Sequence, residues 1–183
     1  MHRHSVRDFA RKFSWAIGAT AVLLATTADA GTLSDAQIAG IYIQMNGFDI
    51  DTALLGRSQA SSEAVRKLAE HVAADHIGVR QAIYGIAEKC GALPVLPSER
   101  IAAAVEHDKT LARLLVLKGA EFDKAYVEHE VAFHRAAIEA VKTALLPSAT
   151  CPELQAHLKL VLPAFEHHLL QTEALAAAPQ AVK

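Results

Sequence analysis

The segment CGALPVLPSER, residues 90–100, decides how this chain is expected to fold. It separates two long helical patterns, because Gly91 favours a helix end and Pro94 and Pro97 make a stiff connection. A shorter helix is expected after it, over about residues 98–117. If this shorter helix runs back along the molecule, the long helices before and after it are parallel. That arrangement is the one-crossover topology of ferritin-like bundles.

Four longer segments are expected to be helices, because apolar residues recur in them at steps of three and four and no stretch alternates like a strand. They run over about residues 34–58, 61–90, 120–146 and 152–177. Ser34 or Asp35 can cap the first, Ser61 or Ser62 can cap the second, and Pro152 suits the first turn of the last. We therefore predict an all-α fold, a ferritin-like four-helix bundle with one short crossover helix between the second and third long helices.

The start of the chain has the features of a secretory leader. After a basic stretch, WAIGATAVLLA (15–25) is a short apolar run, and ADA (28–30) has the small-x-small form of a signal-peptidase site. The run is shorter than the roughly 20 residues that a membrane-spanning helix needs. We predict a signal peptide over residues 1–30, a ferritin-like bundle over residues 31–177 and a disordered tail over residues 178–183. A retained membrane anchor is the alternative to cleavage.

Charge excludes several classes of partner. The whole chain carries 18 Lys and Arg against 20 Asp and Glu, and removal of the leader leaves a net charge of about −4. Such a chain offers no basic surface for nucleic acid or anionic lipid. No later segment is long and apolar enough to span a membrane. Together with the predicted signal peptide, this favours a periplasmic protein, and a homo-oligomer or an envelope protein partner stays open.

The two cysteines favour the crossover topology. Cys90 ends the second long helix and Cys151 precedes the fourth, so the crossover brings both to the same end of the bundle. In an up-and-down bundle they would lie at opposite ends, whereas a disulfide needs Cα atoms within about 7 Å. An even pair in an exported chain predicts one disulfide, with two unpaired thiols as the alternative.

Polar residues of four helices are expected at one height near the middle of the bundle. At 1.5 Å per residue, offsets of about 13–17 residues from the cysteine end place His76, His134, His168 and Asp49 at roughly 20–25 Å. His76, His134 and His168 continue the apolar stripes of their helices and are expected to be buried. A buried cluster of histidines and carboxylates must be paired or bind a metal, because an unpaired buried charge is costly.

Imidazole with a carboxylate co-ligand suits transition metals, and we predict a site for Cu, Zn or Fe. Its candidate ligands are His76, His134, His168, His129, Glu130, Asp49 and Asp75. In HEVAFH (129–134) the two histidines are five apart and differ by about 140° around the helix, so they cannot aim at one point by backbone direction alone. We assign direct coordination to His134 and a supporting or neighbouring position to His129. The alternative is a metal-free polar layer in which Asp49 or Glu130 hydrogen-bonds the histidines.

The other motifs in the sequence give weaker evidence for a function. HEVAFH lacks the four-residue spacing of zinc-protease helices, and no Glu-x-x-His pair of di-iron bundles occurs. No acid–base pair or nucleophile stands out, so we predict no catalytic residue and place an enzyme behind the other classes. His71 is expected to extend the cluster or lie on its rim, whereas His107 and His157 are expected to be solvated.

Four segments carry a family resemblance: NGFDIDTALLGRSQA, VRKLAEHVAADHIGVRQ, LKGAEFDKAYVEHEVAFHRAAIEAV and LPAFEHHLLQTEAL. Over about residues 36–176 the sequence resembles a bacterial family of exported helical bundles, a domain of unknown function often labelled "predicted outer membrane protein". The resemblance implies a ferritin-like fold and no established activity. The family positions include Asp75, His76, Phe122, Asp123, Tyr126, His129, Glu130, His134 and His168, and the family usually shows glutamate where this chain has Asp49.

Two classes of function follow from these observations. The first is a periplasmic bundle that stores, buffers or senses a transition metal at the mid-bundle cluster. The second is a metal-free envelope stress or protein-interaction module with a structural polar layer. Converging imidazole nitrogens would favour the first class, and exposed apolar patches would favour the second.

Overall fold

The structure is a computed structural model that describes residues 32–178, so the predicted signal peptide and most of the predicted tail lie outside the described residues. The described part contains helices and no strand. The helices are α1 (Asp35–Gln59), α2 (Glu63–Lys89), η1 (Ser98–Arg100), α3 (Ile101–Val116), α4 (Gly119–Ala140), η2 (Val141–Leu145), α5 (Leu146–Ser148) and α6 (Pro152–Ala177). No helix of this described part is long and apolar enough to cross a membrane.

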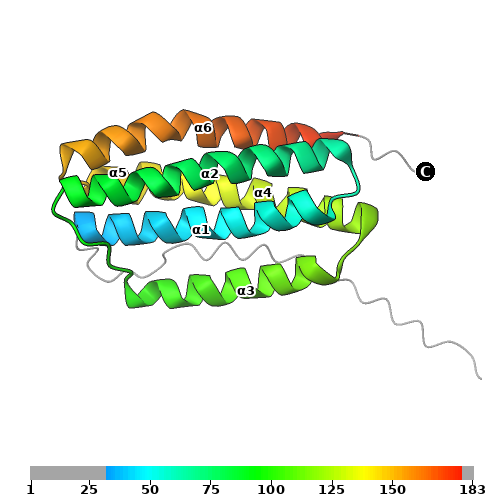
Figure 1. Cartoon of the computed structure of the whole chain (residues 1–183), viewed down its shortest axis with the longest axis horizontal. Coiled ribbons are helices and arrows are strands. Elements are labelled where there is room, and N and C mark those ends of the chain that lie inside the picture. The colour runs from blue at the N-terminus through cyan, green and yellow to red at the C-terminus, as the bar shows by residue number, and fades with distance from the viewer. Residues whose placement is uncertain (1–31, 179–183) are drawn as a thin grey trace, which may run out of the picture.

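Helices α1, α2, α4 and α6 form the bundle, and α3 lies outside it along α1 (Figure 1). Helix α1 packs mainly on α2, and α4 packs mainly on α6. Because α3 returns along the bundle, α2 and α4 run in the same direction. The predicted all-α, ferritin-like topology with one crossover helix is confirmed.

The helix after the crossover continues further than expected. The helices α4, η2 and α5 follow one another without a gap, and η2 is a π-helix. The sequence predicted an end before Pro147, but α5 includes this proline in its first turn and ends at Ser148. Pro147 closely follows the π-helical turns of η2, so its missing N–H falls where the helical hydrogen-bond pattern changes, one residue before the helix ends.

A glycine in α1 brings the crossover connection close to the bundle. A Cβ atom at Gly40 would collide with the carbonyl oxygen of Val95. The N–H of Val95 donates to the carbonyl oxygen of Ala36 at 2.9 Å, which attaches the connection to the first turn of α1. Gly40 weakens the helix by its own propensity, and the structure explains its presence by this close approach.

The end of the bundle that holds both cysteines is covalently and electrostatically fixed. Cys90 and Cys151 form a disulfide with Cα atoms 5.9 Å apart, so the predicted pairing is confirmed. The carboxylate of Asp35 accepts from the backbone N–H groups of Thr150 and Cys151 at 2.8 and 3.0 Å, at the start of α6. Asp35 itself begins α1, whose cap is Ser34. A carboxylate at a helix N-terminus stabilises its exposed N–H groups.

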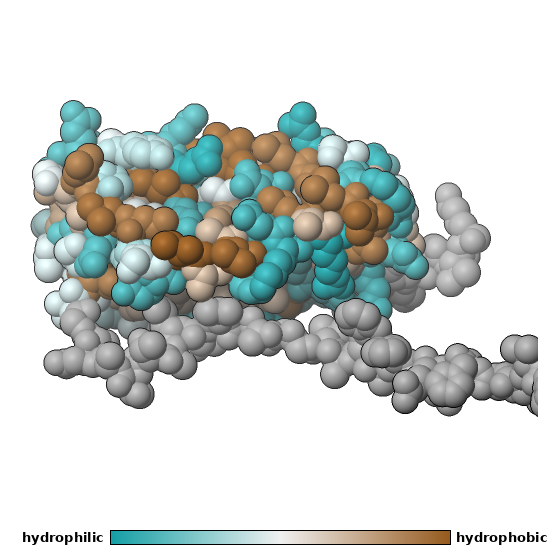
Figure 2. Space-filling model, turned by 90° about the horizontal axis from the view of Figure 1, so that it is seen from below, coloured by the Kyte–Doolittle hydropathy of each residue, from teal (hydrophilic) through white to brown (hydrophobic). Residues whose placement is uncertain are grey.

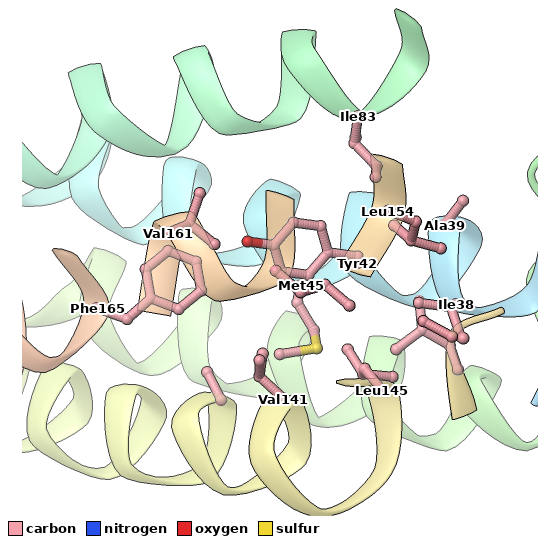
Figure 3. Close-up of a cluster of buried hydrophobic side chains, with 14 of the residues drawn as sticks. Ile38, Ala39, Tyr42, Met45, Ile83, Val141, Leu145, Leu154, Val161 and Phe165 are labelled. Carbon is pink, nitrogen blue, oxygen red and sulfur yellow. The ribbon is translucent and has the colours of Figure 1, made fainter. Parts of the chain in front are cut away.

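The interior consists of two apolar clusters with a polar layer between them. The first cluster lies toward the disulfide and includes Ile38, Tyr42, Leu145 and Phe165, whose side chains point into the space between the helices (Figure 3). The second lies toward the opposite end. Buried polar residues from all four bundle helices lie between the clusters: Asn46, Asp49, Thr52, His76, Glu130, His134, His168 and Thr172.

Candidate metal centre

Three imidazole rings meet in the middle of the bundle, one each from α2, α4 and α6. They belong to His76, His134 and His168, and each residue is at most 1% exposed. The ring centroids are 5.3, 5.4 and 5.6 Å apart, so the rings form a nearly equilateral triangle. One ring nitrogen of each residue lies within 4.8 Å of one from each of the others. Phe165, a member of the first apolar cluster, stacks on His76 with ring centroids 4.8 Å apart, so the triangle lies directly against that cluster.

Asn46 fixes which nitrogen of His76 carries the proton. The amide nitrogen of Asn46 donates to the carbonyl oxygen of Tyr42, one turn earlier in α1, at 2.8 Å. The amide oxygen of Asn46 therefore faces Nδ1 of His76 at 2.9 Å and accepts a hydrogen bond from its N–H. In the neutral ring, Nε2 then keeps its lone pair, and this atom is buried without a hydrogen-bond partner.

The other two histidines are fixed in the same way. Nδ1 of His134 lies 3.0 Å from the carbonyl oxygen of Glu130 and donates to it, so its buried, unpartnered Nε2 keeps the lone pair. His168 has the opposite orientation: Nε2 donates to the carboxylate of Asp75 at 3.0 Å, and Nδ1 is buried without a partner. Metal-binding histidines commonly donate their second N–H to a carbonyl or carboxylate, which fixes tautomer and ring orientation. All three histidines show this arrangement.

Asp49 of α1 adds a carboxylate at the same level. Its Oδ2 lies 3.0 Å from Nε2 of His76 and 3.4 Å from Nε2 of His134, and the side chain is fully buried. Neither carboxylate oxygen makes a hydrogen bond. Burial raises the pKa of Asp49, but the neighbouring His76 and His134 outweigh that effect and lower it below its usual range. The aspartate, although shorter than the glutamate of the resembling family, thus reaches two histidines.

A second carboxyl group, that of Glu130 in α4, completes the layer. Its Oε1 accepts from the hydroxyl of Thr52 at 3.2 Å, whereas Oε2 is buried without a partner. Burial and the charge of Asp49 raise the pKa of Glu130 well above its usual range. An ionised carboxyl next to a protonated one is the expected state when two such groups share a buried site. Asp49, Glu130 and His134 also form a group that could hold a metal ion.

Burial keeps two of the three imidazoles in the neutral form that metals bind. Desolvation lowers the pKa of His134. Desolvation, together with the charges of His134 and His76, lowers the pKa of His168 to about 4. A histidine must be neutral to offer its nitrogen to a metal ion. These two side chains therefore need no deprotonation at neutral pH.

The structure keeps His129 away from the triangle. This residue belongs to none of the potential ligand groups among the described residues. Its ring lies beside Phe133, with centroids 5.9 Å apart, and its Nε2 is buried without a partner. Burial lowers the pKa of His129 to about 4. The five-residue separation from His134 places the two rings on different faces of α4.

Asp75 lies on the rim, where it orients His168 rather than joining the interior nitrogens. Its side chain is 41% exposed, and the half-exposed His71 lies one turn earlier in α2 with its Nε2 3.6 Å from the same carboxylate oxygen. His71, Asp75 and His168 form another group that could hold a metal ion. A fourth such group contains Cys90 and Cys151, whose sulfur atoms are already joined in the disulfide.

Two histidines that the sequence predicted to be solvated are buried, each only 8% exposed. His107 of α3 stacks on Phe48 of α1 with ring centroids 4.2 Å apart. The ring of His157 lies edge-on to that of Tyr42 at 5.9 Å. The prediction for His107 was wrong because the crossover helix packs this face on α1, and that for His157 because it lies against the first apolar cluster.

Asn46 and Thr52 are site residues that the sequence did not single out. Both lie three residues from Asp49, so they share its face of α1. This spacing is the signal by which a polar face of α1 could have been found. The sequence of α1 alone could not show that Asn46 reaches the ring of His76 on α2.

Exposed apolar side chains gather on α3 and the connection that precedes it. Figure 2 views the side on which α3 lies and shows apolar atoms grouped among polar ones. The large apolar residues of this stretch that are exposed are Leu93, Val95, Leu96, Ile101, Val105, Leu115 and Val116. We call this set the α3 patch.

Comparisons with known proteins agree with this fold. The chain is similar to the crystal structure of a Streptomyces coelicolor protein of the DUF305 family that is described as a candidate secreted protein. The sequence identity is 16%, the TM-score is 0.66, and the match covers 77% of this chain and 90% of that chain. A search of curated proteins gave no match. Residues 21–175, most of the chain, match one family, and the chain therefore belongs to the family described as Domain of unknown function (DUF4142).

Proposed function

We propose that this protein binds a transition-metal ion at His76, His134 and His168 with Asp49 as the fourth ligand. One observation carries the proposal. Each imidazole has one nitrogen held by an acceptor and one buried nitrogen without a partner, and the free nitrogens of His76 and His134 lie beside the Asp49 carboxylate, which has no hydrogen-bond donor. Unsatisfied buried polar atoms are destabilising, and a cation between them would satisfy all of them together.

The donor set favours zinc or copper over harder cations. Three imidazoles and one carboxylate suit a four-coordinate zinc ion or Cu(II), and iron is the remaining candidate. Metal–nitrogen distances of about 2.0–2.1 Å require ligand atoms closer together than the 4.8 Å bound of the triangle. Small side-chain rotations within the layer would close that difference. Glu130 would lie beside the ion and accept or release a proton as the local charge changes.

The proposed role is storage, buffering or sensing of this ion in the periplasm. The three histidines and Asp49 are all buried, so none of the proposed ligands contacts bulk solvent. Such a site suits retention of an ion better than rapid turnover of a substrate. The periplasmic location rests on the predicted signal peptide, and N-terminal sequencing of the exported protein should begin at Gly31 or within a residue or two of it.

Titration calorimetry on the mature protein without an affinity tag tests the metal site. The wild type should bind one Cu(II) or Zn(II) per chain, and His134→Ala should weaken that binding strongly. His167→Ala is a matched control because His167 adjoins His168 on α6 but is exposed. Binding no tighter than that of an exposed histidine pair would refute the proposal, as would equal losses in His134→Ala and His167→Ala.

The α3 patch supports a second candidate function, a protein-interaction module of the envelope. Contiguous exposed apolar residues often mark a protein contact. In that case the polar layer would hold helix register without metal. The same calorimetry separates the candidates, since this one expects no metal binding and a loss of partner binding when Ile101 or Val116 is changed to a charged residue.

A further inference from the structure

We propose that metal ions reach the buried site through the seam between α2 and α6, where His71 and Asp75 capture the ion and His168 passes it inward. The inference rests on the proposed function and adds the route to it. Helices α2 and α6 pack along each other, and the three residues come from these two helices only (Figure 1).

His168 belongs to two potential ligand groups at once. It forms one group with His71 and Asp75 at the surface and another with His76 and His134 in the interior. Its two nitrogens face these two groups separately, because Nε2 donates to Asp75 while Nδ1 is buried without a partner. A single ring therefore connects the exposed group with the buried one.

The imidazole rings form a continuous series from solvent to the interior. The ring of His71 lies 5.3 Å from that of His168, which lies 5.3 Å from that of His134 and 5.4 Å from that of His76. The side chain of His71 is 50% exposed, whereas those of His168 and His134 are at most 1% exposed. The exposed fraction of the side chain thus falls from half at His71 to nearly zero at His168, the next ring in the series.

Asp75 couples capture at the surface to movement of His168. Its Oδ2 lies 3.0 Å from Nε2 of His168 and 3.6 Å from Nε2 of His71. A cation that binds this oxygen and His71 competes with the N–H of His168 for the same carboxylate. The ring of His168 then loses the bond that holds it and is free to turn, while its Nδ1 lone pair takes the ion. Transfer is a ligand exchange, in which the ion loses water and surface ligands and no redox step occurs.

Stopped-flow uptake of Co(II), followed by its ligand-field absorption, tests this route on the full mature chain. His71→Ala should lower the association and dissociation rates together by about tenfold, because it removes the imidazole that first captures the ion at the surface. The equilibrium affinity should stay within about twofold, because His71 lies outside the final ligand set and a group that acts only on the route changes both rates equally. His71→Lys should slow uptake further, since it places a fixed positive charge beside the route.

Two controls make the outcomes distinct. His167→Ala removes an exposed histidine next to His168 on α6 and should leave both rates unchanged. If the wild type binds no Co(II), the proposed function fails and the route fails with it. If the wild type binds Co(II) and His71→Ala and His71→Lys keep wild-type rates, the route alone is overturned. An equal slowing in His167→Ala would also overturn it, because the effect would not be specific to this seam.

Discussion

Replacement of Asp49 by asparagine should change the stability of the metal-free protein and its metal affinity in opposite senses. Asparagine has nearly the same shape and removes the charge. In the wild type, the carboxylate of Asp49 is fully buried and faces Nε2 of His76 and of His134, and none of these atoms makes a hydrogen bond. The amide N–H of an asparagine at this position could donate to either of these lone pairs.

The metal-free variant should therefore be more stable than the metal-free wild type. A buried polar group without a partner costs about 1–3 kcal/mol, and a charged one costs more. We expect Asp49→Asn to raise the free energy of unfolding by about 1–3 kcal/mol in the presence of a chelator. For a domain of this size, each kcal/mol corresponds to about 2–4 °C in Tm.

Metal should reverse this order or remove it. Loss of residues that merely orient metal ligands weakens binding by 10–100-fold, so loss of the anionic ligand should weaken it by at least about 100-fold. At a free metal concentration 1,000 times the wild-type Kd, binding stabilises the wild type by about 4.1 kcal/mol. At the same concentration the variant would be only about tenfold above its own Kd and would gain about 1.4 kcal/mol.

Urea unfolding with a chelator and with excess Zn(II) measures both quantities on the same preparations. Asp51→Asn is the matched control, because Asp51 lies two residues further along α1 with its side chain 54% exposed. A metal-free Asp49→Asn protein that is less stable than the wild type, with an unchanged gain from Zn(II), would refute the reasoning. That result would mean that Asp49 is the partner of a protonated histidine in a metal-free polar layer.

Three further outcomes are expected. His134→Ala should weaken Cu(II) or Zn(II) binding by at least about 100-fold in calorimetry, because a direct ligand exceeds the effect of an orienting one, whereas His167→Ala should leave the affinity within error. The contribution of His168 to metal affinity, measured as the loss caused by His168→Ala at each pH from 8 to 4, should persist below pH 6.5, the usual histidine pKa, because burial lowers the pKa of His168 to about 4; a disappearance of this contribution centred at pH 6.5 would contradict this. Reduction of the Cys90–Cys151 bridge should lower the free energy of unfolding by about 4 kcal/mol in the chain-entropy view, measured by urea unfolding with and without reductant, and an unchanged midpoint would contradict it.

The metal-free wild-type protein should lose stability as pH falls from about 6.5 toward 4. The depressed pKa of His168 means that the unfolded chain binds this proton at a higher pH than the folded chain does. The unfolded state therefore holds more protons across this window, and stability rises with pH there. Urea midpoints of the chelator-treated protein at pH 7 and pH 5 provide the measurement, and an equal or higher midpoint at pH 5 would contradict the buried, neutral state of this ring.

The sequence predicted the topology because the distance of a residue along a helix axis follows directly from the number of residues before it. Each residue advances a helix by 1.5 Å, so the distances of His76 and His134 from the cysteine end could be estimated before any contact was known. The same reasoning required the crossover to bring Cys90 and Cys151 together, and the disulfide confirms it. Predicted and observed helix ends differ by only one or two residues at most positions.

The direction in which each side chain points was harder to predict. Helix α4 is apolar over most of its circumference, so its sequence pattern does not define one inward face. The sequence assigned direct coordination to His134 and a supporting or neighbouring position to His129, but it could not show that the ring of His129 lies beside Phe133. The role of Asp75 depends on a side-chain contact between α2 and α6, which the periodicity of either helix leaves undefined.

The distribution of unsatisfied atoms separates a functional layer from a structural one. A buried polar layer that only fixes helix register is stable when every member is hydrogen-bonded, since partly satisfied networks are worse than apolar packing. Among the described residues, eleven buried side-chain atoms lack a partner, and six of them belong to Asp49, His76, Glu130, His134 and His168. The other five belong to five different residues, Tyr42, Tyr126, His129, His157 and Gln171, with one atom each. The unsatisfied atoms therefore concentrate where the ligands converge, which is the pattern expected when local stability is given up for binding.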